Sequence, residues 1–460
     1  MQSNQVSESE EELLDHFDSS QKLEILNQEQ MNYFLALHIP PEVWEDASNR
    51  NLLSFSQKFV RETKEFTLNG RNVQYIYLLQ FLTNLTELSL QENQISDISA
   101  VSKLKNLKKV DLYNNSIEDI PALQSFTDLI NLAELNLSEN NISDISNIYN
   151  LKYLKILYLI LNRITDISAL QFLPDLIYLN LSTQLDKLTS YTITLPNLVE
   201  LVLGGNPLQD ISGLQYSPKL ERLHLDRTET TDLRSIPHQL FGLKELYLSY
   251  NYLTEISYLS NFVDLQILDL DKNKQLQNIG PLKFCTQLTE LSINYTSISD
   301  LWPLQFMKNL KTLNMDSTKV VDLHPLQNLY KLEQISAEDG CIMDVSPLQK
   351  LTQLNTLYFW NNKITNTKTL KNHNNFSKYL LQKQKVPTKE ERQLYNKILS
   401  VHSSHKQIQQ IQTENKISKI QESMNRQKES IKLQINEQIQ VMNKKIQLWM
   451  QFIQNSYADQ

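Results

Sequence analysis

Three successive stretches decide the fold: LTELSLQENQISDISAV (85–101), LKKVDLYNNSIEDIPAL (107–123) and LAELNLSENNISDISNI (132–148). They share the pattern L-x-x-L-x-L-x-x-N-x-I-x-D-I-x-x-L. The alternation of Leu88 and Leu90 with polar residues is typical of a short strand with one buried face. A unit of this size cannot bury its apolar side chains alone, so the pattern predicts copies that stack on one another.

The asparagine of this pattern returns along most of the chain. Its step is 22 residues except for one step of 25 and two of 23. The column reads Asn93, Asn115, Asn140, Asn162, Gln184, Asn206, Thr228, Asn251, Asn273, Thr296, Thr318, Gly340 and Asn362. A degenerate first copy precedes it, with Phe66, Leu68, Val73 and Ile76 in matching places. We therefore predict about fourteen repeats over residues 60–367.

Each residue type has a physical task in the repeat. Both leucines of L-x-L face the core, and Ile95 and Ile98 fill it from the far side. The asparagine satisfies backbone groups where the chain turns out of the strand. The D-I-S or D-L-x-P segment starts a short helical turn. Expected helix caps are Ser99, Ser146, Ser168 and Ser212. Prolines expected at a first helical position are Pro121, Pro281, Pro303, Pro325 and Pro347.

This stretch resembles the 22-residue class of leucine-rich repeats, found in regulatory subunits of type-1 protein phosphatase and in bacterial internalins. The resemblance implies an α/β solenoid: a horseshoe with a parallel sheet on its concave side. It also implies protein binding and, for the phosphatase group, a phosphatase catalytic subunit as the partner. The polar, acidic start MQSNQVSESEEELLDHFD lacks the features of a signal peptide. We therefore expect a cytoplasmic protein, with the nucleus left open.

The N-terminal residues differ from the repeats. Residues 1–20 are acidic and have little to bury, which predicts a disordered tail. Residues 21–59 carry apolar periodicity and are predicted to form a helical cap over the first repeat. Within them, IPPEV (39–43) also resembles the start of an F-box, which implies a ubiquitin-ligase adaptor as a further alternative.

The C-terminal residues form two predicted segments, a linker or cap at 368–387 and a basic Gln- and Lys-rich helix at 388–456. From Ile435 to Ile453 the apolar residues are spaced 4-3-4-3-4, the seam of a coiled coil. This pattern predicts that the helix mediates homo-oligomerisation or tethers the protein to a partner. The alternative is that the helix docks on the solenoid of its own chain.

Charge is unevenly divided along the chain. Residues 371–460 hold 15 Lys and Arg against 7 Asp and Glu, a balance of +8, whereas the whole chain carries −8. The preceding residues must therefore carry −16. An acidic body is poorly suited to phosphate, so we predict no nucleic-acid partner. No run of 18 apolar residues occurs, so we predict no membrane span.

No catalytic constellation is evident in the sequence. His402 and His405 lack further metal ligands nearby. Cys285 and Cys341 are predicted to be small packing residues. We predict a non-enzymatic protein that needs no cofactor and holds no metal ion.

The residues flanking each L-x-L pair should face solvent on the concave side, where acidic side chains outnumber basic ones. LKYLKILYLILNRI (151–164) breaks this rule, because its solvent-facing positions are apolar. An exposed apolar patch in a polar surround is typical of an interaction site. The predicted partner-binding residues are Tyr113, Ile156, Tyr158, Ile160, Tyr178, Tyr247, Tyr358 and Trp360.

These observations predict a scaffold or regulatory subunit that binds a protein partner with a basic rim on its concave face. A type-1 phosphatase regulator is the form that the resemblance implies. A cytoskeletal or ciliary scaffold built from repeats and a coiled coil stays open as an alternative of a different class.

Overall fold

The computed structural model describes residues 61–118 and 129–365, together with 384, 388–390, 392, 393 and 396. The predicted N-terminal tail and cap (1–59) lie outside these residues. So do most of the predicted linker (368–387) and of the predicted C-terminal helix (388–456). In that helix, the Arg392 N–H donates to the Thr388 carbonyl at 3.1 Å, which is one helical turn at the predicted start.

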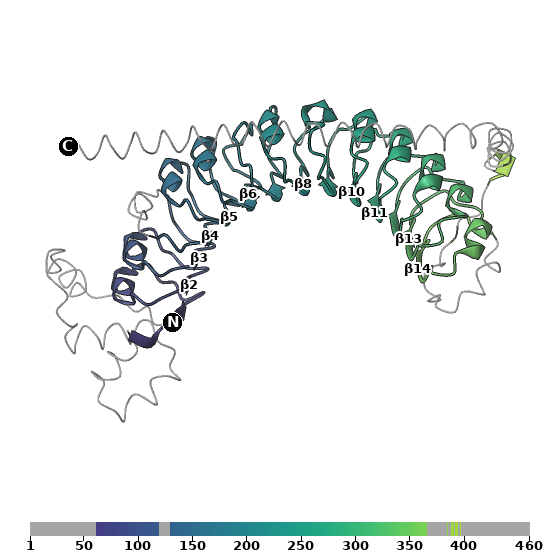
Figure 1. Ribbon diagram of the computed structural model, residues 1–460. Helices are drawn as coiled ribbons and strands as arrows, with labels where there is room; N and C mark the ends of the chain where they lie inside the picture. The colour runs from purple at the N-terminus through teal and green to yellow at the C-terminus, as the bar shows by residue number, and fades with distance from the viewer. Residues whose placement is uncertain are drawn as a thin grey trace, which may run out of the picture.

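The described repeats coil into an open arc whose inner side is one parallel sheet (Figure 1). Its 14 strands pair strictly in chain order. The strands are β1 (Glu65–Thr67), β2 (Glu87–Ser89), β3 (Lys109–Asp111), β4 (Glu134–Asn136), β5 (Ile156–Tyr158), β6 (Tyr178–Asn180), β7 (Glu200–Val202), β8 (Arg222–His224), β9 (Glu245–Tyr247), β10 (Ile267–Asp269), β11 (Glu290–Ser292), β12 (Thr312–Asn314), β13 (Gln334–Ser336) and β14 (Thr356–Tyr358). The predicted horseshoe with a parallel concave sheet is confirmed, including the degenerate first repeat, since Phe66 pairs with Leu88.

The outer side of the arc carries short 3-10 helices. They are η1 (Tyr77–Phe81), η2 (Ser99–Lys103), η4 (Ser146–Asn150), η5 (Ser168–Phe172), η6 (Ser212–Tyr216), η7 (Leu233–Ser235), η8 (Ser257–Asn261), η9 (Gly280–Phe284), η10 (Trp302–Phe306), η11 (His324–Leu326) and η12 (Ser346–Lys350). The expected α/β solenoid is thus corrected in its helical part, because a 22-residue coil leaves room for only one tight turn.

The predicted serine caps are wrong, because each serine is the first residue of its helix and an isoleucine precedes it at the cap position. Ser99 is the first residue of η2, and its N–H donates to the Asp97 carboxylate at 2.8 Å. The same contact recurs at Ser146 with Asp144, Ser168 with Asp166, Ser212 with Asp210, and Ser346 with Asp344. The aspartate of the D-I-S motif is therefore the residue that starts the turn, through an Asx-type contact. Pro281, Pro303, Pro325 and Pro347 lie at the predicted helix starts, and Pro121 lies outside the described residues.

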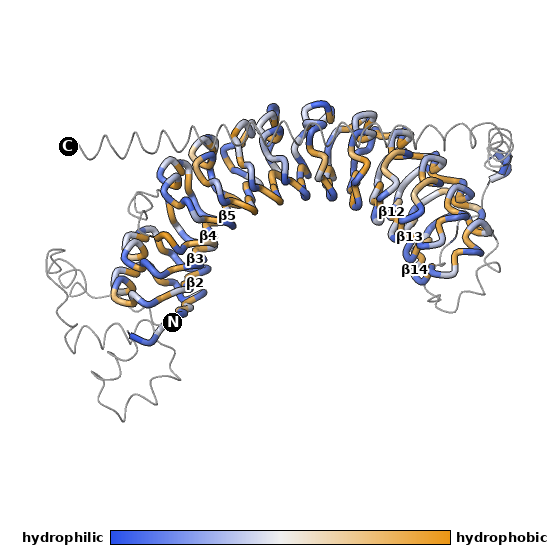
Figure 2. Tube along the Cα trace, viewed as in Figure 1, coloured by the Kyte–Doolittle hydropathy of each residue, from blue (hydrophilic) through white to orange (hydrophobic). Residues whose placement is uncertain are grey.

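The core runs as one apolar column through the arc. Leu157 and Leu159 are fully buried, as are their counterparts in the neighbouring coils. Ile95 and Ile98 close the same core from the convex side, as predicted. Hydrophobic and hydrophilic stretches alternate along each coil (Figure 2). Each repeat therefore depends on its neighbours for burial.

The asparagine column forms the predicted ladder. The Asn115 amide donates to the Leu90 carbonyl of the preceding coil at 2.9 Å and accepts from the Ile95 N–H at 3.0 Å. Thr228, by contrast, donates its hydroxyl to the Leu225 carbonyl of its own coil at 2.8 Å and to the Asn251 Oδ1 of the next coil at 3.3 Å. The amide thus satisfies backbone groups on two coils at once, which explains its prevalence in the repeat.

The ladder has one more rung than the sequence predicted. Gln384 lies 22 residues after Asn362. Its amide donates to the Phe359 carbonyl at 2.8 Å, and its Oε1 accepts from the Ile364 N–H at 3.1 Å. These bonds match those of Asn362 with Ala337 and Ile342. The stretch predicted as a linker or cap therefore contributes a capping rung to the last described coil.

Candidate functional site

The concave face carries all the side chains that the sequence predicted for partner binding. On β5, Leu157 is fully buried, whereas Ile156 and Tyr158 are half-buried and face the hollow of the arc. Ile160 lies two residues after the end of the strand and is also half-buried. The predicted strand register is therefore confirmed.

Tyr158 and Tyr178 come together across β5 and β6. Their ring centroids lie 4.9 Å apart at a tilt of 47°. Ile156 pairs with Tyr178 in the sheet register, and Ile160 lies two residues after Tyr158 along the chain. We call Ile156, Tyr158, Ile160 and Tyr178 the apolar patch.

Further apolar and aromatic side chains follow the patch along the face, with Asn180 of β6 standing between Tyr158 and Val202 in the sheet register. Val202 on β7 stands opposite His224 on β8, and His224 stands opposite Tyr247 on β9. The His224 and Tyr247 rings stack with centroids 4.2 Å apart and planes within 5°. Burial lowers the pKa of His224, which favours the neutral ring. We call the patch together with Val202, His224 and Tyr247 the apolar stripe; it crosses β5 to β9.

Val202 and His224 belong to this stripe but are not among the residues that the sequence predicted for partner binding. The signal was present, since both occupy the solvent-facing place between the two leucines of their strands. Neither residue type is conspicuous alone, and only the stacking geometry joins Tyr247 to the patch.

Three predicted residues lie apart from the stripe. Tyr113 follows β3, and a hydrogen bond with the Glu139 carboxylate raises its pKa. Tyr358 on β14 is 39% exposed, and half-buried Trp360 follows that strand. Since β14 is nine strands from β5, these two aromatic residues form no common site with the apolar patch.

The basic side chains beside the stripe are already paired. The Arg222 Nε donates to Glu200 at 2.5 Å, and the Lys109 Nζ lies 2.8 Å from Glu134. Hydrogen bonding to Glu200 raises the pKa of Arg222 further. Carboxylates of the same face therefore neutralise these two positive charges.

Beyond Tyr247 the face turns acidic. Asp271 accepts from the Ser292 hydroxyl and the Asn294 N–H, both at 2.7 Å. Asp269 on β10 accepts from the Asp271 N–H at 2.9 Å. Desolvation, and then repulsion from neighbouring carboxylates, raise the pKa of Asp269 to about 7. The carboxylates that flank or end the stripe are Asp226, Glu245, Asp269, Asp271 and Glu290.

Replacement of Asp269 with Asn should stabilise the protein at high pH only. The folded-state pKa of about 7 exceeds the ordinary 3.8, so ionisation costs stability as pH rises from about 4 to 7. After allowance for solvent screening, we expect Asp269→Asn to raise the free energy of unfolding by about 1–2 kcal/mol near pH 8 and by about 0 near pH 4. Urea unfolding at both pH values tests this, with exposed Asp186→Asn as the control. An equal gain at both pH values would contradict it.

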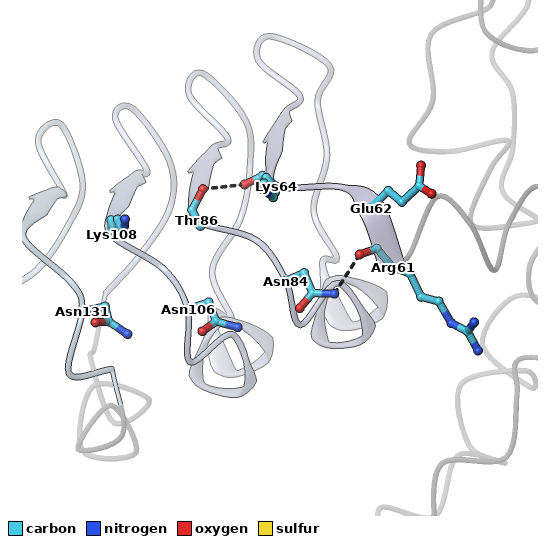
Figure 3. A pocket seen from close by; sticks show the side chains of 8 residues that line it. All are labelled: Arg61, Glu62, Lys64, Asn84, Thr86, Asn106, Lys108 and Asn131. Atoms are coloured by element: carbon cyan, nitrogen blue, oxygen red, sulfur yellow. Dashed lines mark hydrogen bonds between the residues drawn. The ribbon is translucent and has the colours of Figure 1, made fainter.

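A polar hollow lies at the N-terminal end of the arc, away from the stripe (Figure 3). It is lined by Arg61, Glu62, Lys64, Asn84, Thr86, Asn106, Lys108 and Asn131. Asn84 donates to the Arg61 carbonyl at 2.8 Å, and Thr86 donates to the Lys64 carbonyl at 3.1 Å. These contacts join successive coils, so we assign them a structural role.

The described part of the chain offers neither a metal cluster nor a membrane-spanning helix. Among residues 61–118 and 129–365, no group of three or more His, Cys, Asp or Glu side chains is placed to hold a metal ion. No helix in the described ranges has the length and apolarity to cross a membrane. Cys285 is buried, as predicted, while Cys341 is half-buried.

Comparison with known proteins agrees with the repeat geometry. The family model for leucine-rich repeats (2 copies) matches residues 83–125, 130–171 and 242–284. Leucine-rich repeat-containing protein 56 of Rattus norvegicus is 34% identical over 117 residues, which are 25% of this chain and 21% of that protein. The Arabidopsis thaliana homolog of protein phosphatase 1 regulatory inhibitor subunit PPP1R7 is 30% identical over 113 residues, 25% of this chain and 31% of that protein. The matches thus span under a third of either relative.

Solved structures share the fold over a longer range. An internalin from Listeria monocytogenes is 28% identical with a TM-score of 0.54, covering 77% of this chain and 96% of that one. A leucine-rich-repeat protein of Leptospira interrogans has a TM-score of 0.62 at 24% identity, covering 76% and 86%. The second likeness concerns the fold alone.

Proposed function

We propose, from the premise that this chain is a leucine-rich-repeat protein, that it binds a protein partner on its concave face through the apolar patch. One observation carries the proposal: the half-buried cluster of Ile156, Tyr158, Ile160 and Tyr178 faces the hollow of the arc. Neighbouring strands place polar side chains there, such as Glu134 on β4.

The chemistry of the patch suits a protein ligand. Aromatic and branched aliphatic side chains that lie together at the centre of a polar surface are typical binding anchors. The surrounding carboxylates favour a partner with a basic rim, because complementary charge guides and orients association. The function is therefore proposed to be non-enzymatic recognition.

For the partner, we propose the catalytic subunit of a type-1 protein phosphatase. The similarity to the Arabidopsis regulatory-subunit homolog supports this choice, as does the resemblance of the repeat pattern. Self-association through residues 435–453 and a cytoplasmic location are further proposals, which gel filtration at two concentrations and fluorescence imaging would test.

The experiment compares the intact protein with Ile156→Glu/Ile160→Glu as baits for a native lysate and for purified type-1 phosphatase catalytic subunit. Thr312→Glu/Asn314→Glu on β12 adds the same charge to the same face and is the matched control. We expect the patch variant to lose at least about tenfold in affinity while the control keeps it. Equal binding by all three proteins would overturn the role of the patch. A patch-dependent partner other than the phosphatase would overturn only the choice of partner.

A further inference from the structure

We infer that the apolar stripe receives an amphipathic α-helix of a partner protein, laid across the strands, with its cationic end against the carboxylates at β10 and β11. This inference rests on the proposed function and specifies the shape and charge of the ligand. It draws on the length of the stripe, the pairing of the sheet and the distribution of charge.

The stripe is long and narrow. Its aromatic pairs, Tyr158 with Tyr178 and His224 with Tyr247, lie on either side of Val202. Five neighbouring strands at about 4.8 Å spacing give a length of roughly 19 Å. That length corresponds to roughly 13 residues of α-helix. A helix of three to four turns thus matches the stripe.

The sheet presents side chains, and not free backbone groups, to a ligand on this face. Each of β5 to β9 pairs with a strand on both sides. Their N–H and C=O groups are engaged within the sheet, so a peptide cannot add as another strand on this face. A helix satisfies its own backbone and presents one apolar side, which is the form of ligand that such a surface accepts.

Charge sets the orientation of the ligand. The acidic end at β10 carries Asp269 and Asp271, and Glu290 follows on β11. At the β5 end the nearby charges, Lys109 and Glu134, pair with each other. A cationic side chain of the ligand is therefore stabilised at the β10 end, where its charge also offsets the desolvation and the carboxylate repulsion that raise the pKa of Asp269.

The test uses the full chain and a designed peptide of about 18 residues. The peptide carries leucines at i, i+3, i+4 and i+7 spacing and two arginines at one end, and fluorescence anisotropy measures its Kd. A first control peptide has the same composition in an order that scatters the leucines around the helix, and a second has Gln in place of both arginines. We expect each control to bind at least about tenfold more weakly.

Protein variants locate the peptide on the stripe. We expect Val202→Glu to weaken the amphipathic peptide at least about tenfold, and Thr312→Glu to leave its Kd within about twofold. Asp269→Asn should weaken the arginine peptide and leave the glutamine peptide unchanged, because only the former places a cation there.

Affinity for the arginine peptide should also rise from about pH 6 to about pH 8, because Asp269 becomes ionised in this range. The rise should vanish in Asp269→Asn. The titratable groups around Asp269 are Asp226 and His224 on the β8 side, Glu245 and Tyr247 on β9, Asp271 two residues after the end of β10, and Glu290 on β11.

Three outcomes overturn the inference. Equal binding of the ordered and scattered peptides excludes a helical ligand. Binding that Val202→Glu leaves unchanged excludes the stripe. The peptide could also bind only to the variant Ile439→Asp/Ile446→Asp, which alters the predicted coiled-coil seam of residues 435–453. That result would assign the stripe to this chain's own C-terminal residues. The proposed function fails separately, when the lysate partner survives Ile156→Glu/Ile160→Glu.

Discussion

Leu157→Glu is expected to unfold the middle of the solenoid, whereas Ile156→Glu with Ile160→Glu is expected to leave the fold intact. Leu157 is fully buried between the leucines of β4 and β6. The substitution removes that packing and places an unpaired carboxylate in the core, with a combined cost of at least about 5 kcal/mol. The two isoleucines face the concave hollow, so their glutamates reach water.

Circular dichroism melts of the three proteins measure this difference. The patch variant should melt within a few degrees of the unmodified protein, and Leu157→Glu should lose its cooperative transition or melt at least about 10 °C lower. A reversed order of the melting temperatures would show that the side chains of β5 point the other way.

The repeat was predictable because its signals are periodic and local. Leu88, Leu90 and Asn93 each carry one physical task, and the 22-residue recurrence aligns them from one copy to the next. The positions of the helical turns were predictable, but the 3-10 type of helix and the residue that caps it were not. Ser99 and Asp97 are both good capping residues, and only the contact between them shows that the aspartate accepts the bond.

The last rung shows a limit of pattern matching. Gln384 follows Asn362 by the regular step, yet the leucines that normally accompany the asparagine are degraded to the run FSKYLLQKQ (376–384). The long side chain of glutamine reaches the same backbone groups, as Gln184 also does when it donates to the Leu159 carbonyl at 2.8 Å. The predicted ladder therefore ends one rung too early because the accompanying leucines are degraded, although glutamine already stands in the column at Gln184.

The position of the apolar patch was predictable from the sequence, but the extension of the apolar stripe to β9 was not. Solvent-facing columns placed Ile156, Tyr158 and Tyr178 on neighbouring strands, and ring contact follows from that register. The stacking of His224 on Tyr247 depends on side-chain rotamers, which the positions of these residues in the repeat pattern do not specify. The raised pKa of Asp269 depends on desolvation and on carboxylates from other repeats, which the residue's place in its own repeat does not indicate.

The coil between β6 and β7 departs from the geometry of its neighbours. Its packing against the next coil requires a glycine at position 213. Over residues 189–193 the chain forms an isolated β-bridge where the neighbouring coils form a 3-10 helix. Ser190 forms a parallel bridge with Asp210, and the Tyr191 N–H donates to the Asp210 carbonyl at 2.7 Å. This segment presses against Gly213, whose N–H donates to the Tyr191 carbonyl at 2.9 Å. Contact between two backbones at this point leaves no room for a side chain.

Gly213→Ala should therefore destabilise the protein strongly although it adds one methyl group. A Cβ atom at Gly213 would lie 2.6 Å from the Ile193 carbonyl oxygen and 2.7 Å from its nitrogen, so backbone must move. We expect the free energy of unfolding to fall by about 3 kcal/mol, measured by urea unfolding. Gly242→Ala is the matched control, because its nearest neighbour would be the Leu220 carbonyl oxygen at 3.6 Å, and its effect should stay within about 1 kcal/mol. Equal stabilities of the two variants would mean that residues 189–193 do not pack on η6, and the geometry of this coil would lose its physical explanation.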